Sequence, residues 1–150
     1  MKRVLRGLGW IAFWSYVAAL FVLGIFGVVA PGLELASLYD LSLAPLADAE
    51  AASVLHQVRF LKVFVLGIGV LAVMFRREIL RPGLAHRLFV GFLFAAAGGR
   101  LLSILLDGVP HPRLVSFTLS ELVMGLLILI AARVGAEHPA RPQAALSAGA

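Results

Sequence analysis

The stretch LGWIAFWSYVAALFVLGIFGVVA, residues 8–30, contains no charged residue and decides the fold of this chain. A transmembrane helix needs about 20 consecutive apolar residues to cross the hydrocarbon core of a bilayer. Three further stretches of this kind follow at residues 54–75, 84–106 and 114–132. The sequence therefore predicts an all-α fold: an antiparallel bundle of four transmembrane helices within one membrane domain, residues 1–134.

The composition of the whole chain supports a membrane protein. Hydrophobic residues make up 61% of the 150 residues and charged residues 14%, whereas soluble domains have roughly 45–50% apolar and about 25% charged residues. The chain has no cysteine, which excludes disulfide frameworks, zinc–cysteine sites and thiol nucleophiles. Its formal charge of +5 does not indicate nucleic acid as a partner, because the basic residues lie between apolar stretches and form no single solvated face.

The basic residues predict the orientation of the spans. Lys and Arg beside short loops stay on the cytoplasmic side, and nine of them fall on one side of the four spans. Arg113 is the single basic residue in the opposite loops, which carry five acidic residues. We therefore expect both termini to be cytoplasmic. Because the alternation of an outer-membrane barrel is missing from the sequence, we expect a multi-pass protein of the bacterial inner membrane, with the lipid bilayer as its first partner.

The outer loop and the C-terminal tail, two segments outside the spans, are expected to differ in structure. The outer loop at residues 31–53 mixes leucines with acids, which is typical of a segment at the membrane interface. Within it, Pro45, Asp48 and Glu50 predict the start of the second helix, since proline is favoured at the first helical position and acids near the positive end of the helix dipole. The tail at residues 135–150 has no apolar periodicity, and we expect it to be a disordered cytoplasmic segment.

A stripe of small residues in the third span predicts how the helices pack. Gly91, Ala95 and Gly99 recur every fourth residue, a spacing that allows two helix backbones to approach closely in a membrane. Gly24 and Gly27 in the first span can act in the same way. The alternative is that these glycines only reflect the raised glycine frequency of membrane helices.

Charged residues inside the spans are the candidates for a functional site, because such charges are costly in a bilayer and usually face a bundle interior. Lys62, Arg100 and Glu121 each lie about 18–21 Å from the nearest cytoplasmic arginine, at a rise of ~1.5 Å per residue. Arg59 lies one turn further along, on the same side as Lys62. We expect Glu121 to pair with Arg100 or Arg59, since the arginine fork binds a carboxylate through two hydrogen bonds.

Three cations facing one carboxylate would leave a surplus positive charge, unless Asp107 or an acidic residue of the outer loop folds in. Such a surplus predicts a pocket for an anionic or hydrogen-bond-accepting headgroup from the outer leaflet. A structural role is the alternative: a buried ion pair that only fixes helix register, or, for Arg59 and Lys62, side chains that extend outward to lipid headgroups. His56, Asp107 and His111 lie at the expected outer mouth. No metal and no cofactor is expected, because the candidate ligands lack the helical spacing of a recognised metal motif.

Several motifs in the second half of the chain resemble a known family. The motifs are GGRLLS at residues 98–103, Asp107-Gly108, the Pro-His-Pro loop at residues 110–112, and Glu121-Leu122. They resemble the uncharacterised bacterial family of small four-helix membrane proteins DUF4345, which by architecture is similar to the DoxX-type membrane proteins, a likeness of fold that carries no function. The resemblance implies that one pattern is formed by Arg59, Arg100, Ser103, Asp107, His111 and Glu121. Lys62 and the long acidic outer loop depart from that pattern.

Three classes of function remain open. The first is a non-catalytic accessory or assembly protein, within a homo-oligomer or a larger membrane complex, whose core is held by ion pairs. The second is an outward-facing binding or enzymatic site for a lipid-like or anionic small molecule, and the third is proton- or ion-coupled transport by an oligomer. The sequence has no serine elbow, phosphate loop or paired-histidine helix, which favours a protein that is not an enzyme. A cavity among the last three spans, closed by side chains or open to the outer leaflet, would distinguish the first two classes.

Overall fold

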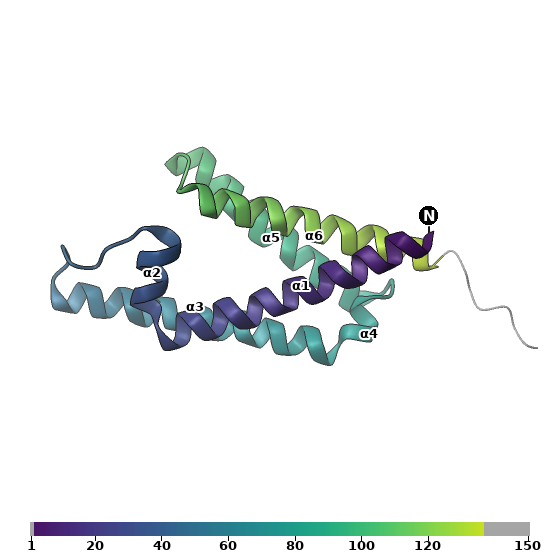
Figure 1. Cartoon of the computed structure of the whole chain (residues 1–150), viewed down its shortest axis with the longest axis horizontal. Coiled ribbons are helices and arrows are strands. Elements are labelled where there is room, and N and C mark those ends of the chain that lie inside the picture. Colours follow the sequence, from purple (N-terminus) through teal and green to yellow (C-terminus); the bar gives the residue numbers. More distant parts are fainter. Residues whose placement is uncertain (1, 137–150) are drawn as a thin grey trace, which may run out of the picture.

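The computed structural model describes residues 2–136, and within them the chain forms helices and no strands. Six helices follow one another (Figure 1): α1 (Lys2–Val29), α2 (Pro31–Tyr39), α3 (Asp48–Met74), α4 (Arg76–Ile79), α5 (Leu84–Asp107) and α6 (Pro112–Ala136). The long helices α1, α3, α5 and α6 are each long and apolar enough to cross a membrane. The predicted all-α fold with four spanning helices is confirmed, and the chain is a multi-pass membrane protein.

The segment between the first two spans is more regular than the sequence analysis expected. Pro31 occupies the start of α2, where its fixed φ favours a helix. Asp40 ends α2 with a left-handed φ of 55°, and its N–H donates to the carbonyl of Leu35. α3 then begins at Asp48, and the N–H of Ala47 donates to the Glu50 carboxylate at 3.2 Å. The helix start predicted near Pro45 is therefore present as the start of α3, and the short helix α2, which was not predicted, precedes it.

The ends of the spans define two ends of the bundle (Figure 1). The amino-terminal end holds the start of α1, the short α4 and the end of α6, whereas the α2 end holds α2 and the connection from α5 to α6. α6 continues to Ala136, so the first two residues of the predicted tail belong to this helix. The rest of the predicted disordered tail, residues 137–150, lies outside the described residues.

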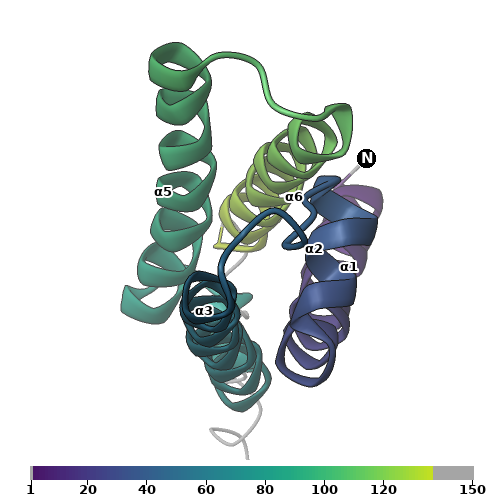
Figure 2. The same cartoon turned by 90° about the vertical axis from the view of Figure 1, so that its left-hand side faces the viewer.

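α1 is the central helix of the bundle. It packs along α3 on one side and along α6 on the other, and α6 packs in turn against α5. The view along the bundle in Figure 2 shows this order. Within residues 2–136, α3 and α5 lack comparable contact, and an apolar groove lies between them. The bundle is therefore closed on three sides and open between α3 and α5.

Glycines on α1 explain why this helix occupies the centre. A Cβ on Gly9 would collide with the Cβ of Ala131 in α6. A Cβ on Gly24 would lie 2.6 Å from Cγ of Leu66 in α3. Each neighbouring helix thus approaches α1 more closely than a side chain would allow, which is the usual means of close packing between membrane helices.

The small-residue stripe of the third span has no such contact. Gly91, Ala95 and Gly99 are exposed on α5, and a Cβ added to either glycine would meet no atom within 4 Å. The prediction that this stripe packs against another helix of the same chain is therefore wrong. The small residues leave one side of the α5 backbone uncovered, because the neighbouring helix α6 contacts a different side of α5.

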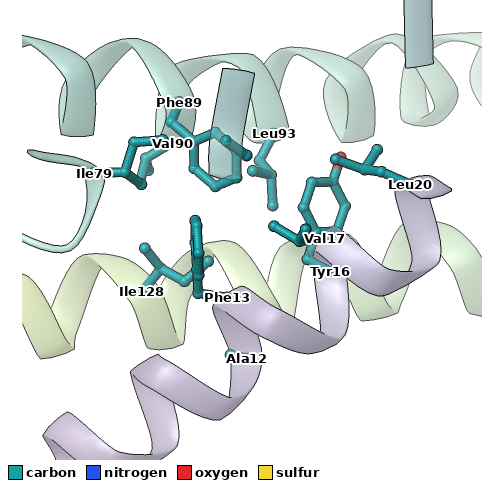
Figure 3. Close-up of a cluster of buried hydrophobic side chains, with 11 residues drawn as sticks. Ala12, Phe13, Tyr16, Val17, Leu20, Ile79, Phe89, Val90, Leu93 and Ile128 are labelled. Carbon is teal, nitrogen blue, oxygen red and sulfur yellow. The ribbon is translucent and has the colours of Figure 1, made fainter. Parts of the chain in front are cut away.

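The apolar core lies in the half of the bundle nearest the amino-terminal end. Phe13 and Leu93 are 0% exposed and Ile128 is 1% exposed, so side chains of α1, α5 and α6 bury one another there. The ring centroids of Phe13 and Phe89 are 5.7 Å apart, and those of Tyr16 and Phe89 are 6.0 Å apart. Figure 3 shows these side chains pointing toward one another. Apolar packing of this density fixes the positions of the helices that continue toward the α2 end.

Candidate functional site

A cavity of about 200 Å³ lies inside the bundle on the α2 side of this core. Helices α1, α2, α3, α5 and α6 all contribute to its walls. Three charged side chains line it, Lys62, Arg100 and Glu121, together with Tyr16 and Tyr39. The three charges that the helical rise placed at one level therefore line one cavity.

Arg100 and Glu121 form an ion pair between α5 and α6. Nη1 of Arg100 lies 3.0 Å from Oε2 of Glu121, and the Glu121 side chain is 14% exposed. The Arg100 side chain is 41% exposed and lines a second cavity on its other side. Because a guanidinium has five N–H donors, Arg100 retains donors beyond its contact with Glu121.

A second ion pair joins Lys62 to Glu34, a residue that the sequence analysis did not single out. Nζ of Lys62 contacts Oε1 of Glu34, and Glu34 is 0% exposed. The Lys62 ammonium also lies 5.9 Å from the ring centroid of Tyr39, a cation–π contact. Lys62 thus turns into the bundle and does not extend to lipid headgroups.

Two further residues hold this pair in place. A Cβ on Gly27 would collide with Oε2 of Glu34 and with Cγ of Lys62, so the glycine provides the space that the pair occupies. Nη1 of Arg113, at the start of α6, donates to the carbonyl of Ser37 in α2. α2 is therefore attached over the cavity by contacts to α1, α3 and α6.

The second pair changes the charge of the site. Lys62 and Arg100 are each matched by one carboxylate, Glu34 and Glu121, so the alternative in which an acidic residue of the outer loop folds in is the one that the structure shows, and the surplus of positive charge is removed. The sequence did contain a signal for Glu34, because Pro31 marks a helix start and Glu34 falls in its first turn. The cavity consequently offers hydrogen-bond donors and acceptors without net charge.

Arg59 lies away from Glu121. Its Nε donates to the carbonyl of Val28 at 3.3 Å, and the residue is exposed. The last carbonyls of a helix have no intrahelical partner and carry partial negative charge. Arg59 therefore stabilises the end of α1, and the alternative pairing of Glu121 with Arg59 is wrong.

A second cavity, of about 260 Å³, adjoins the first at Arg100. Ser103, Asp107 and Thr118 contribute its polar groups. Oγ of Ser103 donates to Oδ2 of Asp107 at 2.7 Å, one helical turn away. Three residues of the family pattern, Arg100, Ser103 and Asp107, thus face one space between α5 and α6.

The histidines of the expected outer mouth lie apart from both cavities. Nδ1 of His111 accepts the N–H of Arg113 at 3.3 Å, directly before the first turns of α6. His111 therefore caps this helix. His56 is exposed on α3 and lines neither cavity. Between residues 2 and 136, no three His, Asp or Glu side chains are grouped so that they could hold a metal ion.

The fold and the cavities define a small four-span membrane protein with paired charges inside its bundle. The model of the family described as "Domain of unknown function (DUF4345)" matches residues 10–132, and the chain belongs to this family. The match includes every residue that lines the two cavities. None of the curated proteins and none of the solved structures compared with the chain matches it. The function is therefore argued from the site itself.

Proposed function

We propose that the protein binds a membrane-borne amphiphile by its polar head, in the cavity beside Lys62, Arg100 and Glu121. The observation that carries the proposal is the position of Arg100 between two cavities, with 41% of its side chain exposed. A pair that served packing alone would be covered by side chains, since protein interiors are close-packed. Inside a membrane, the N–H groups of Arg100 that do not contact Glu121 need polar partners. The polar head of a ligand would supply them.

The charge balance of the cavity specifies the head. Both cations already face a carboxylate, so an anionic head would bring an uncompensated charge into the membrane, which is costly. An uncharged head with oxygen acceptors would use the spare N–H groups of Arg100 and leave both ion pairs intact. The geometry therefore supports an alcohol, ketone or ester group more than the anionic headgroup expected from the sequence.

The proposal includes a location in the bacterial inner membrane with both termini cytoplasmic. Its support is the sequence, in which nine basic residues adjoin one set of span ends and Arg113 adjoins the other. The cavity would then lie in the outer-leaflet half of the bundle. Reporter fusions after Arg81 and at the C-terminus are expected to read cytoplasmic, and a periplasmic signal from either would overturn this orientation.

The test of head binding uses the full chain in phosphatidylcholine nanodiscs and a hexadecanol that carries a diazirine beside its hydroxyl. Crosslinking is expected at the cavity and should fall about tenfold in Arg100→Gln, because hydrogen bonds to charged groups contribute ~1.5–3 kcal/mol. Arg59→Gln, a matched change on an arginine outside the cavity, should leave it unchanged. Unlabelled hexadecanol should compete, and palmitate should compete less. Equal labelling of both variants would contradict the proposal.

An accessory role in a larger assembly is the second candidate, and the exposed face of α5 favours it. Gly91, Ala95 and Gly99 leave the backbone of this face uncovered, and small residues of this kind pack against other membrane helices. A homo-oligomer or a membrane complex would cover them. Native mass spectrometry from nanodiscs tests this role, because Ala95→Phe should reduce the assembled mass while head binding by one chain persists.

A further inference from the structure

An apolar groove of about 390 Å³ lies between α3 and α5, in the half of the bundle nearest the amino-terminal end. Leu71, Leu84 and Leu88 stand at its sides and are each more than half exposed. Within the described residues, direct contact between α3 and α5 is too sparse to close this side, and Figure 2 shows the two helices moving further apart toward the α2 end. The groove therefore opens toward the hydrocarbon of the bilayer.

The groove adjoins the polar cavity, because the two spaces share part of their walls. Ile68 of α3 and Phe92 of α5 line both spaces. Along α3 the axial distance is ~9 Å from Lys62 to Ile68 and ~20 Å from Lys62 to Phe75, at ~1.5 Å per residue. The groove thus begins beside the polar cavity, within reach of the tail of an elongated molecule whose head lies at the charges.

Helix α4 bounds the far end of the groove. Ile79 of α4 is 4% exposed and contributes to the groove wall. The Ile79 carbonyl lies 2.7 Å from Nδ1 of His86, a buried residue near the start of α5. This contact holds α4 against α5, so the groove ends inside the protein.

We infer that the groove holds the tail of the ligand, and that the ligand is a single-chain amphiphile that reaches its site sideways from the bilayer, between α3 and α5. The inference rests on the proposed function for the head and adds the chemical class of the whole molecule. The two spaces, of about 390 and 200 Å³, together fall in the range of ~300–1,000 Å³ typical of small-molecule sites. Their combined length along α3 exceeds one leaflet of the hydrocarbon core, which is half of ~30 Å.

One chain fits this arrangement better than two. The space on the other side of Arg100 carries the polar groups of Ser103, Asp107 and Thr118, which do not suit a second hydrocarbon tail. The groove itself is lined by aliphatic and aromatic side chains throughout. A monoacyl or isoprenoid chain with an uncharged oxygen-bearing head combines the features that both spaces require.

The test uses a hexadecanol with its diazirine at mid-chain, in the same phosphatidylcholine nanodiscs. Tryptic cleavage after Lys62, Arg76, Arg87 and Arg100 separates residues 63–76 and 88–100 from α1 and α6. Fragmentation of these two peptides then separates groove positions, such as Leu71 and Leu88, from cavity positions, such as Val65 and Ala96. The mid-chain probe is expected to label the groove positions. The probe labelled beside the hydroxyl should label the cavity.

Two matched substitutions on α5 then test occupancy of the groove. Ala85 lines the groove, so Ala85→Phe should lower labelling of both segments about tenfold by filling it. Ala95 is exposed and lines neither the groove nor the cavity, so Ala95→Phe should leave labelling unchanged. The thermal midpoint of each variant is measured without probe. If Ala85→Phe does not fold, the positions that the mid-chain probe labels in the unmodified chain decide whether the tail occupies the groove.

The outcomes separate the inference from the proposal on which it rests. Labelling that depends on Arg100 but falls on α1 or α6 would overturn the tail site and leave head binding in place. Equal labelling of the groove by hexadecane with the same mid-chain diazirine, unaffected by Arg100→Gln, would mean that bulk lipid fills it, and would overturn both. Groove labelling that requires the hydroxyl and Arg100, and is lost in Ala85→Phe, supports both.

Discussion

In the half of the bundle near the amino-terminal end, Phe13, Leu93 and Ile128 fill the space between α1, α5 and α6 and are almost fully buried. In the half near α2, the same three helices, together with α2 and α3, surround a cavity of about 200 Å³ that Arg100 and Glu121 line. Close packing is the default of protein interiors, and the first half shows that these helices can achieve it. The polar cavity between these helices is therefore not a general property of their packing. The amino-terminal half also has open space, the groove between α3 and α5, but that groove is apolar, so the charged lining distinguishes the cavity near α2 and points to a role in binding.

The largest expected effect is on the packed half. Phe13→Ala should lower the free energy of unfolding by ~3–5 kcal/mol, because the removed ring leaves a cavity among fully buried neighbours. Phe117 lines the existing cavity and is partly exposed, so Phe117→Ala should cost about half as much or less. Steric trapping or thermal unfolding in detergent measures both variants. Equal losses would mean that the two halves do not differ in packing.

The next effect concerns the contact between α1 and α6 in the packed half. Gly9→Ala should destabilise by ~1–3 kcal/mol, because its methyl group would collide with the Cβ of Ala131. Gly7 lies on the same helix, and a Cβ there would meet no atom within 4 Å. Gly7→Ala is the matched control and should be neutral or slightly stabilising through helix propensity. A stable Gly9→Ala variant would show that α1 and α6 are further apart than described.

A smaller effect is expected between the charges of the open half. Arg100→Gln and Glu121→Gln should each destabilise, and the double variant should differ from the sum of the singles by ~0.5–3 kcal/mol, because the two side chains share a contact. Arg59→Gln combined with Glu121→Gln should be additive within about 0.5 kcal/mol, since Arg59 donates to Val28 instead. Unfolding curves of all five variants provide the comparison. Additive values for Arg100 and Glu121 would remove the ion pair from the site.

The smallest effect is expected on the outer face of α5. Gly91→Ala should raise the free energy of unfolding by up to ~1 kcal/mol in a detergent that keeps the protein monomeric, because alanine favours a helix and no neighbour obstructs it. The same unfolding assay applies. A clear loss of stability would place another helix of this chain against Gly91 and would restore the packing predicted from the sequence.

The spans and the common depth of the charges could be predicted from the sequence, because each prediction uses only properties of a single helix. Apolar length identifies a spanning helix, and the helical rise places Lys62, Arg100 and Glu121 at one depth. Neither the apolar length nor the helical rise depends on which helices are neighbours. The structure accordingly agrees with both.

Contacts that depend on how a helix is rotated about its own axis, relative to its neighbours, could not be predicted from the sequence. The stripe of Gly91, Ala95 and Gly99 shows that one face of α5 is bare, but only the position of α6 decides whether that face is covered. Arg59 and Lys62 share a side of α3, yet Arg59 reaches the end of α1 while Lys62 turns inward. Glu34 was missed because α2 is short and interfacial, so its apolar pattern is too weak to predict which residue is buried.

The central place of α1 has a consequence for biosynthesis. α1 emerges from the ribosome first, and α3 can pack on it as soon as both are inserted. α5 has its main contact with α6, which follows it in the chain, so α5 remains without its principal partner until α6 has been made. Docking of α6 therefore fixes the position of α5, and with it the width of the groove between α3 and α5, only after α1 and α3 have already packed together.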